Sequence, residues 1–199
     1  MTRSWLAVLM DPIADPAPEG EPLSSKDRLL DAAIQIAGRE GLRAVTYRAV
    51  AARAGVTHGL VRHHFGTREQ LLNEAFRRAA EQDSDGVRLR ADSIEAFAST
   101  FVEWFNSSWE RSVLQFDETT QAIRGALPMD NIRQQYEGYI DKVRDTFAAV
   151  GIDDPDGGVA AMVFATLDGL ALQHLIFRDD LRTERVLDAL RDTLSRLAD

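Results

Sequence analysis

Apolar residues recur at helical spacing through nearly the whole chain after residue 23. The first such segment predicts a helix that starts after Ser24 or Ser25, where a hydroxyl can accept a first-turn N–H, and ends at Gly41. Its apolar positions are Leu29, Ala33, Ile34 and Ala37. No segment alternates apolar and polar residues over the length of a strand. The pattern therefore predicts an all-α fold.

Threonines recur in the next part of the chain at intervals of about ten residues. Thr46, Thr57 and Thr67 stand where a side chain can cap the start of a helix. They predict two short helices over about 46–53 and 57–64, and a longer helix that starts at residue 67 and continues through "REQLLNEAFRRAAEQ".

Four more apolar stripes predict further helices beyond Gly86. The stripes are Ile94, Phe97, Phe101, Phe105 and Ser108; Ile132, Tyr136, Tyr139, Val143 and Phe147; Val163, Leu167, Leu170, His174 and Phe177; and Leu187, Leu190, Leu194 and Leu197. Pro128 and Pro155 lie where a proline can open a helix. Residues 1–23 contain "DPIADPAPEGEP", and we expect them to form a disordered arm.

The spacing of Ala51 and Gly55 predicts that two short helices cross closely. Alanine allows close approach, and glycine suits a connecting turn that needs a positive φ. The apolar interior of this unit would consist of Val50, Ala54, Val56, Leu60 and Val61. Such a helix-turn-helix places the N-terminal end of its second helix in the major groove of DNA. The residues that would project from that helix are Thr57, His58, Gly59, Arg62 and His63.

Charge separates this unit from the rest of the chain. The formal net charge is −9, yet residues 24–72 contain eight Lys and Arg against four Asp and Glu, a balance of +4. The remaining residues contain 15 against 28, a balance of −13. A basic module on an acidic body favours contact of that module alone with a polyanion.

Several classes of protein are disfavoured. The chain contains no cysteine, which fits a cytoplasmic setting, and no run of consecutive apolar residues approaches the roughly 18 that a membrane-spanning helix needs, so no membrane partner is expected. It contains no G-x-S-x-G, no H-E-x-x-H and no phosphate-binding glycine loop, so we do not expect an enzyme or a cofactor. His58, His63 and His64 lack the i, i+4 pairing of metal ligands on a helix, so no metal site is expected.

The stretch "TYRAVAARAGVTHGLVRHHFGTREQLL" resembles the DNA-binding signature of the TetR (tetracycline repressor) family. A-G-V-[ST]-x-G and H-F-G-[ST]-[KR]-E-x-L-L occur in order and at the family's spacing. The resemblance implies a three-helix DNA-binding head over residues 24–72 and a helical ligand-binding and dimerisation domain over 73–199. "ATLDGLALQHLIF", at 165–177, is similar to the family's penultimate helix, which forms the dimer's four-helix bundle with the last helix.

The motif and the resemblance together indicate which residues contact DNA. They are Thr46, Tyr47, Arg48, Thr57, His58, Gly59, Arg62, His63, His64, Thr67 and Arg68. Arg62 replaces a tyrosine that commonly touches a phosphate in the family. An arginine can bind a phosphate or reach a guanine edge, and both alternatives stay open. For His64 the alternative to DNA contact is a half-buried position beside Phe65.

The resemblance implies a ligand-responsive transcriptional regulator that binds a near-palindromic operator as a homodimer, usually a repressor released by a small molecule. The alternative is a DNA-binding architectural or adaptor protein without an effector. The effector is unidentified, and its candidate contacts are Phe101, Trp104, Phe105, Trp109, Tyr136, Tyr139 and His174. These side chains either form core alone or also line a ligand cavity, and a buried His174 with satisfied hydrogen bonds is the alternative to a ligand contact.

Overall fold

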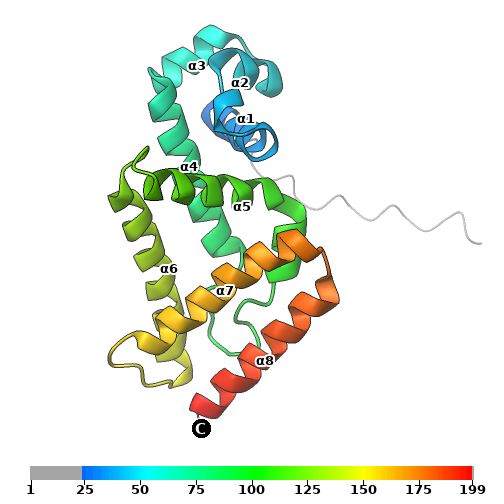
Figure 1. Ribbon diagram of the computed structural model, residues 1–199, viewed down its shortest axis with the longest axis vertical. Helices are drawn as coiled ribbons and strands as arrows, with labels where there is room; N and C mark the ends of the chain where they lie inside the picture. Colours follow the sequence, from blue (N-terminus) through cyan, green and yellow to red (C-terminus); the bar gives the residue numbers. More distant parts are fainter. Residues whose placement is uncertain (1–23, 199) are drawn as a thin grey trace, which may run out of the picture.

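The computed structural model describes residues 24–198. Within that range the chain forms eight α-helices and one short 3-10 turn, and no strand, which confirms the all-α prediction. The expected arm over residues 1–23 lies outside the described residues. Figure 1 shows a head of short helices at one end, a long connecting helix, and a body of longer helices.

The head consists of a helix-turn-helix packed on a preceding helix. Its elements are α1 (Ser25–Glu40), η2 (Leu42–Ala44), α2 (Tyr47–Ala54) and α3 (His58–Phe65). Gly55 adopts the left-handed conformation, with φ +68°, that the turn between α2 and α3 requires. Val50 and Val61 are fully buried beneath this turn, whereas Ala54, Val56 and Leu60 are half-buried. The predicted helix-turn-helix is confirmed.

The connecting helix α4 (Arg68–Gly86) belongs to both parts of the molecule. The Thr67 hydroxyl accepts a hydrogen bond from the Gln70 N–H at 3.1 Å, and the Gln70 side chain accepts one from the Thr67 N–H. Leu71, Leu72, Ala75, Phe76 and Ala79 are buried in the same apolar core as α1, α2 and α3, while Asp83 is buried in the body.

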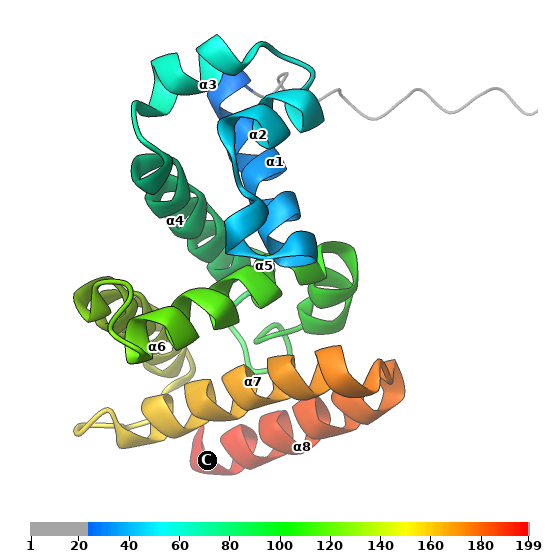
Figure 2. The ribbon, with the colours of Figure 1, turned by 45° about the horizontal axis from the view of Figure 1, so that its top comes forward.

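Four long helices form the body. They are α5 (Phe101–Ile123), α6 (Met129–Val150), α7 (Gly158–Phe177) and α8 (Asp180–Ala198). Figure 2 shows α7 and α8 side by side at the end of the molecule opposite the head. α5 is interrupted at Ser108, whose φ is −152°, and the Ser107 and Ser108 hydroxyls both donate to the Trp104 carbonyl.

The segment over residues 87–100 differs from the prediction. The apolar stripe predicts a helix that already includes Ile94 and Phe97, yet these residues lie in a series of turns and the helix begins only at Phe101. Ala98 has a φ of +53°, which a continuous right-handed helix excludes. The Arg191 guanidinium on α8 donates to the carbonyls of Phe97 and Ala98, both at 3.1 Å, and so holds this conformation.

α7 carries apolar residues on both its buried and its exposed faces. It packs seven residues into the body: Ala160, Val163, Phe164, Leu167, Leu170, Ala171 and His174. By length and composition alone it could cross a membrane, which the sequence analysis missed because polar residues such as Asp168 and Gln173 interrupt the consecutive run. A core helix meets the same criteria. The other face of α7 exposes Met162, Leu172 and Ile176.

Candidate DNA-binding surface and ligand cavity

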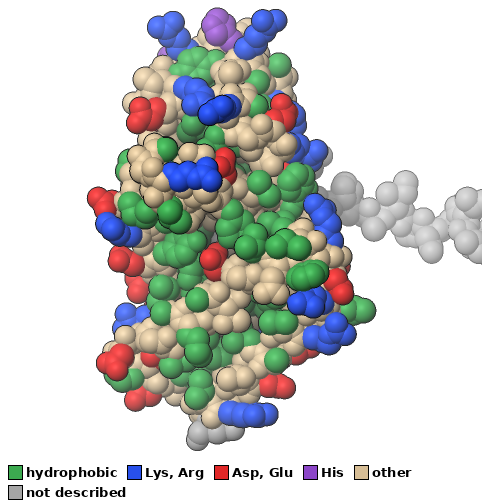
Figure 3. Space-filling view, viewed as in Figure 1, with side chains coloured by type: hydrophobic (Ala, Val, Ile, Leu, Met, Phe, Trp, Pro, Cys, Tyr) green, Lys and Arg blue, Asp and Glu red, His purple; other side chains and the backbone are tan. Residues whose placement is uncertain are grey.

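The segment that contains the helix-turn-helix has basic side chains and no acidic ones. Residues 41–66 contain four arginines and three histidines and no Asp or Glu. The Arg53 guanidinium pairs with the Glu40 carboxylate at 3.5 Å and donates to the Gln35 side-chain oxygen at 3.4 Å. Arg43, Arg48 and Arg62 have no ion-pair partner among the described residues, which leaves their charges available. Figure 3 shows Lys or Arg side chains on either side of a histidine at this tip.

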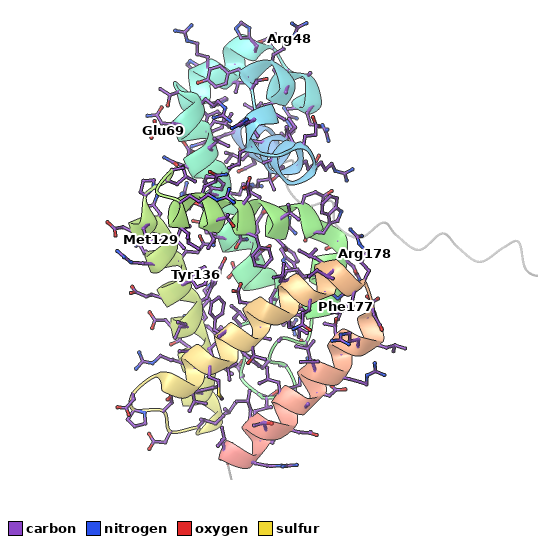
Figure 4. The ribbon with its side chains drawn as sticks, in the orientation of Figure 1. Arg48, Glu69, Met129, Tyr136, Phe177 and Arg178 are labelled. Atoms are coloured by element: carbon purple, nitrogen blue, oxygen red, sulfur yellow. The ribbon has the colours of Figure 1, made fainter. Side chains whose placement is uncertain are left out.

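The exposed side chains of α3 lie where the sequence places them. His58, Gly59, Arg62 and His63 are exposed, while Val61 and Phe65 are buried on the opposite face. Thr57 makes no capping hydrogen bond, so its hydroxyl is free to contact another molecule. Arg48 lies at the same end of the molecule, as its label in Figure 4 shows. These side chains are therefore accessible to a binding partner as the structure stands.

Two capping threonines combine a structural bond with a free proton. Thr46 accepts from the Ala49 N–H at 3.2 Å, and Thr67 accepts from the Gln70 N–H. Because each hydroxyl acts as an acceptor in these bonds, its own O–H remains able to donate to a phosphate oxygen. Both threonines are exposed.

Tyr47 and Arg68 both make hydrogen bonds within the head, and their contacts with DNA stay predictions. The Tyr47 hydroxyl donates to the Gly66 carbonyl at 2.9 Å, so its proton is already used. The Arg68 guanidinium donates to the carbonyls of Val45, at 2.7 Å, and of Leu42. Both side chains therefore stabilise the connections between the short helices. His64 is half-buried, with its ring centre 6.0 Å from that of Phe65, as the alternative for this residue describes.

The body contains a cavity of about 70 Å³ between α4, α5, α6 and α7. Four of the seven predicted ligand contacts line it: Phe101, Phe105, Tyr136 and Tyr139. Its polar lining comprises Asp83, Ser112, Gln115, Thr119, Gln135 and Asp168. Figure 4 shows Tyr136 extending from α6 toward the interior of the body. Its hydroxyl lies 3.4 Å from the Asp168 carboxylate.

The other three predicted ligand contacts lie outside this cavity. Trp104 donates to Asp83 at 2.9 Å, and its ring stacks under the Arg111 guanidinium at 4.2 Å. The Trp109 ring lies near two arginine guanidinium groups, 5.6 Å from Arg39 and 6.0 Å from Arg178. His174 is buried, and its ring nitrogens lie 2.9 Å from the Thr183 hydroxyl and 3.0 Å from the Asn106 side-chain oxygen. It has the satisfied hydrogen bonds of a core histidine.

Asp83 is a buried polar residue that the sequence analysis did not single out. Its carboxylate accepts hydrogen bonds from Trp104, Arg111 and Gln115. Burial raises its pKa to about 6, although those three donors act in the opposite direction. A signal was present, because Asp83 continues the apolar stripe of Phe76 and Ala79. Among the described residues, no group of three or more His, Asp or Glu side chains is arranged to hold a metal ion.

Comparison with known proteins accounts for both parts of the chain. Residues 29–75 match the sequence model described as "Bacterial regulatory proteins, tetR family", and residues 88–198 match "Tetracyclin repressor-like, C-terminal domain". The chain is 25% identical over 189 residues to the HTH-type transcriptional regulator BetI of Burkholderia mallei, a match that covers 85% of this chain and 91% of the relative.

Two further similarities extend over most of the chain. The HTH-type transcriptional repressor KstR2 of Rhodococcus jostii is 26% identical over 176 residues, with 84% of this chain and 75% of the relative covered. The crystal structure of the multidrug binding protein EbrR complexed with ethidium superposes with a TM-score of 0.58 at 27% identity. That match covers 89% of this chain and 99% of the EbrR chain.

Proposed function

Because the chain belongs to the TetR family of bacterial regulators, we propose that it is a repressor that binds a near-palindromic operator as a homodimer and is released by a small molecule. Its class is that of DNA-binding transcriptional regulators and not of enzymes. The observation that carries the proposal is the helix-turn-helix, where Arg48 and Arg62 are exposed without an ion-pair partner among the described residues and residues 41–66 contain no acid. A cytoplasmic location belongs to the same proposal.

The head would read DNA with α3 in the major groove. Arg43, Arg48 and Arg62 would neutralise phosphates, and release of condensed counterions would then make binding strongly dependent on salt. Thr46, Thr57 and Thr67 would add hydroxyl contacts to the backbone, together with the exposed His58, Gly59 and His63. Tyr47 and Arg68 would support these contacts from within the head.

The exposed apolar face of α7 and α8 would form the dimer interface. It comprises Met162, Leu172, Ile176 and Phe177 on α7 and Leu181, Val186 and Leu197 on α8. Ala165 and Gly169 are exposed on the same face and would allow close approach of a second helix. Leu187 and Leu194 do not belong to it, because each is only 1% exposed in the core of its own chain.

The effector would enter the cavity lined by Phe101, Phe105, Tyr136 and Tyr139. A volume of about 70 Å³ is below the roughly 300 Å³ of sites for drug-sized molecules. Binding would therefore separate α6 and α7 from α4, which carries the head, and so favour a conformation in which the two heads no longer fit the operator. That the similar EbrR chain has been crystallised with ethidium supports a ligand site within such a body.

The small volume of the cavity also favours the second candidate function. A DNA-binding architectural or adaptor protein needs no effector, and a body with a nearly filled core would suit it. Retention on operator DNA in the presence of every tested metabolite would support this alternative. Release by any one small molecule would exclude it.

Selection of binding sites from random DNA by the purified protein tests the proposal. We expect a near-palindromic site. If Arg62 binds a phosphate, Arg62→Ala should weaken binding to all sequences and make the slope of log affinity against log salt about one unit shallower. If Arg62 binds a guanine, the variant should lose about 1–3 kcal/mol of binding free energy and relax the base preference at one position per half-site. Arg53→Ala is the matched control, because Arg53 is paired with Glu40 and should matter less. Absence of any enriched sequence would contradict the proposal, and unchanged affinity of Arg62→Ala would remove Arg62 from the interface.

A further inference from the structure

A second hollow lies on the other side of the cavity wall. This cleft, which we name the α4–α6 cleft, has a volume of about 490 Å³. Its lining residues are Asn73, Glu74, Phe76, Arg77, Ala80 and Glu81 of α4, Glu118 of α5, and Asn131, Gln134, Gln135, Gly138, Tyr139 and Lys142 of α6. Gln135 and Tyr139 also line the cavity, so they separate the two spaces. In Figure 4 the starts of α4 and α6, near Glu69 and Met129, lie on the same side of the molecule.

Glu118 is the unusual residue of this cleft. Its side chain lines the cleft although the residue is only 5% exposed, and its Oε2 atom has no hydrogen-bond partner. Burial raises the pKa of this carboxyl to about 7, and no donor or cation opposes that effect. A buried carboxylate oxygen without a donor is unfavourable, so the site is incomplete as it stands.

The cations around the cleft do not complete the site. Arg77 pairs with Glu81 at 3.1 Å, and Lys142 pairs with Asp85 at the same distance. Glu74, the remaining acid of the lining, is held by Lys26 at 2.5 Å. Glu118 is thus the one charged residue of the lining for which the described residues supply no ion-pair partner.

We propose that the α4–α6 cleft binds a small organic cation with N–H donors, an amidinium or primary ammonium on an apolar group, and that Glu118 receives its charge. The N–H groups would donate to the Glu118 carboxylate where it lines the cleft, and the positive charge would stabilise its ionised form. The apolar group would lie against Phe76, Ala80 and Tyr139, which line the same cleft. A quaternary ammonium meets only half of this requirement, because it has no N–H to donate.

The occupant would touch the helix that carries the DNA-binding head. Because α4 supplies one wall and α6 the other, binding would stabilise one spacing between these helices. The site is separate from the effector cavity of the proposed function and stands without it. A ligand in either space would contact Gln135 and Tyr139.

Isothermal titration of the full chain with benzamidine tests the proposal. Benzamidine has the amidinium and an aromatic ring, benzamide is its neutral counterpart, and phenyltrimethylammonium is a cation without N–H groups. We expect benzamidine to bind about ten- to a hundredfold more tightly than either comparison compound. Failure of benzamidine to bind at millimolar concentration, or equal binding of benzamide, would overturn the proposal.

Variants identify the residue and the site. Glu118→Gln should weaken benzamidine binding to the level of benzamide, while Asp117→Asn, which removes the same charge from the next residue of α5 outside the cleft lining, should not. Gly138→Leu should also block binding, since a Cβ at this position meets nothing within 4 Å and the side chain would fill the cleft. Asp168→Asn, in the cavity, should leave the affinity unchanged. Loss of binding in Asp168→Asn with retention in Glu118→Gln would assign benzamidine to the cavity and refute the cleft site.

Discussion

Three buried or half-buried carboxyl groups in the body have raised pKa values. Burial raises the pKa of Asp83 to about 6, raises that of Glu118 to about 7, and shifts that of Asp168 in the same direction. Asp83 has three donors, and Asp168 has the Tyr136 hydroxyl. Glu118 has an oxygen without any, so its ionisation should have the largest effect on stability.

The stability of the protein should depend on pH through Glu118. Its pKa is raised from an ordinary value of 4.5 to about 7 on folding, so between these values the folded chain keeps a proton that the unfolded chain releases. Stability is then highest below pH 4.5 for this group and is lost as pH rises through 7, by about 3 kcal/mol. Urea unfolding at several pH values measures this loss.

The comparison variant for this measurement is Glu118→Gln, which cannot ionise. Asp83 shifts in the same direction and contributes equally to both proteins, so the difference between the two pH profiles isolates Glu118. Parallel profiles across this range would show that the carboxyl of Glu118 is solvated in both states.

For individual residues, the sequence predicts which side chains are exposed better than it predicts their hydrogen-bond partners. The helical period correctly places His58, Arg62 and His63 on the outer face of α3. It cannot show that Arg68 reaches the carbonyl of Val45, because that contact depends on how the chain folds back over 23 residues. The aromatic character of Trp104 predicts a place in the cavity lining, yet the ring lies outside the lining and its indole N–H donates to Asp83, which lines the cavity from α4.

Among the helices, the packing of α1 on α5 joins the head to the body. Gly38 of α1 lies so close to Glu110 of α5 that a Cβ at this position would overlap the Glu110 backbone. The neighbouring Arg39 pairs with the Glu110 carboxylate, which is largely buried. The two helices are therefore held at one separation by a glycine and an ion pair.

Gly38→Ala should force α1 and α5 apart. We expect a loss of about 1–3 kcal/mol in the free energy of unfolding, since backbone atoms of Glu110 cannot move aside as a flexible side chain can. Chemical denaturation measures it. Gly138→Ala is the matched control on α6, where the added Cβ meets nothing within 4 Å and the helix should gain up to about 1 kcal/mol. A gain in both variants would show that α1 and α5 are not in close contact.

The helices with clear caps were predictable, and the segment before α5 was not. Ser24, Thr46 and Thr67 each accept a hydrogen bond from an N–H of the first turn, as their positions indicate. Over residues 87–100 the apolar spacing continues without interruption, so a local pattern predicts a helix. The turns there depend on Arg191, more than 90 residues away, which no local pattern contains.

At the scale of the whole molecule, the end opposite the head exposes large apolar side chains to solvent. Ile176 is 66% exposed and Leu181 is 74% exposed, on helices that lie side by side (Figure 2). Phe177, labelled in Figure 4 at the end of α7, continues this surface. Large apolar side chains exposed on neighbouring helices are typical of interaction sites, which supports the proposed dimer interface.

Charges introduced on this surface should separate the proposed dimer. We expect the double variant Leu172→Glu, Ile176→Glu to sediment as a monomer at micromolar concentration and to lose operator affinity, because each head alone reads only half a site. Ile123→Glu is the control, since Ile123 is 71% exposed at the end of α5, on another part of the molecule. A wild-type protein that already sediments as a monomer would contradict the dimer.

The length of α4 has a mechanical consequence. Its 19 residues span about 28 Å, with one end in the core of the head and the other beside the cavity. Pivoting such a rigid rod by about 5° at the body end swings the head end by about 2.4 Å, and two symmetric rods would change the distance between the heads by about 5 Å. Successive major-groove faces are about 34 Å apart, so a displacement of this size would move the two heads away from the spacing that the operator requires. In the proposed dimer, a displacement of side chains near Asp83 by less than one atomic diameter would thereby be amplified into a larger displacement of the heads.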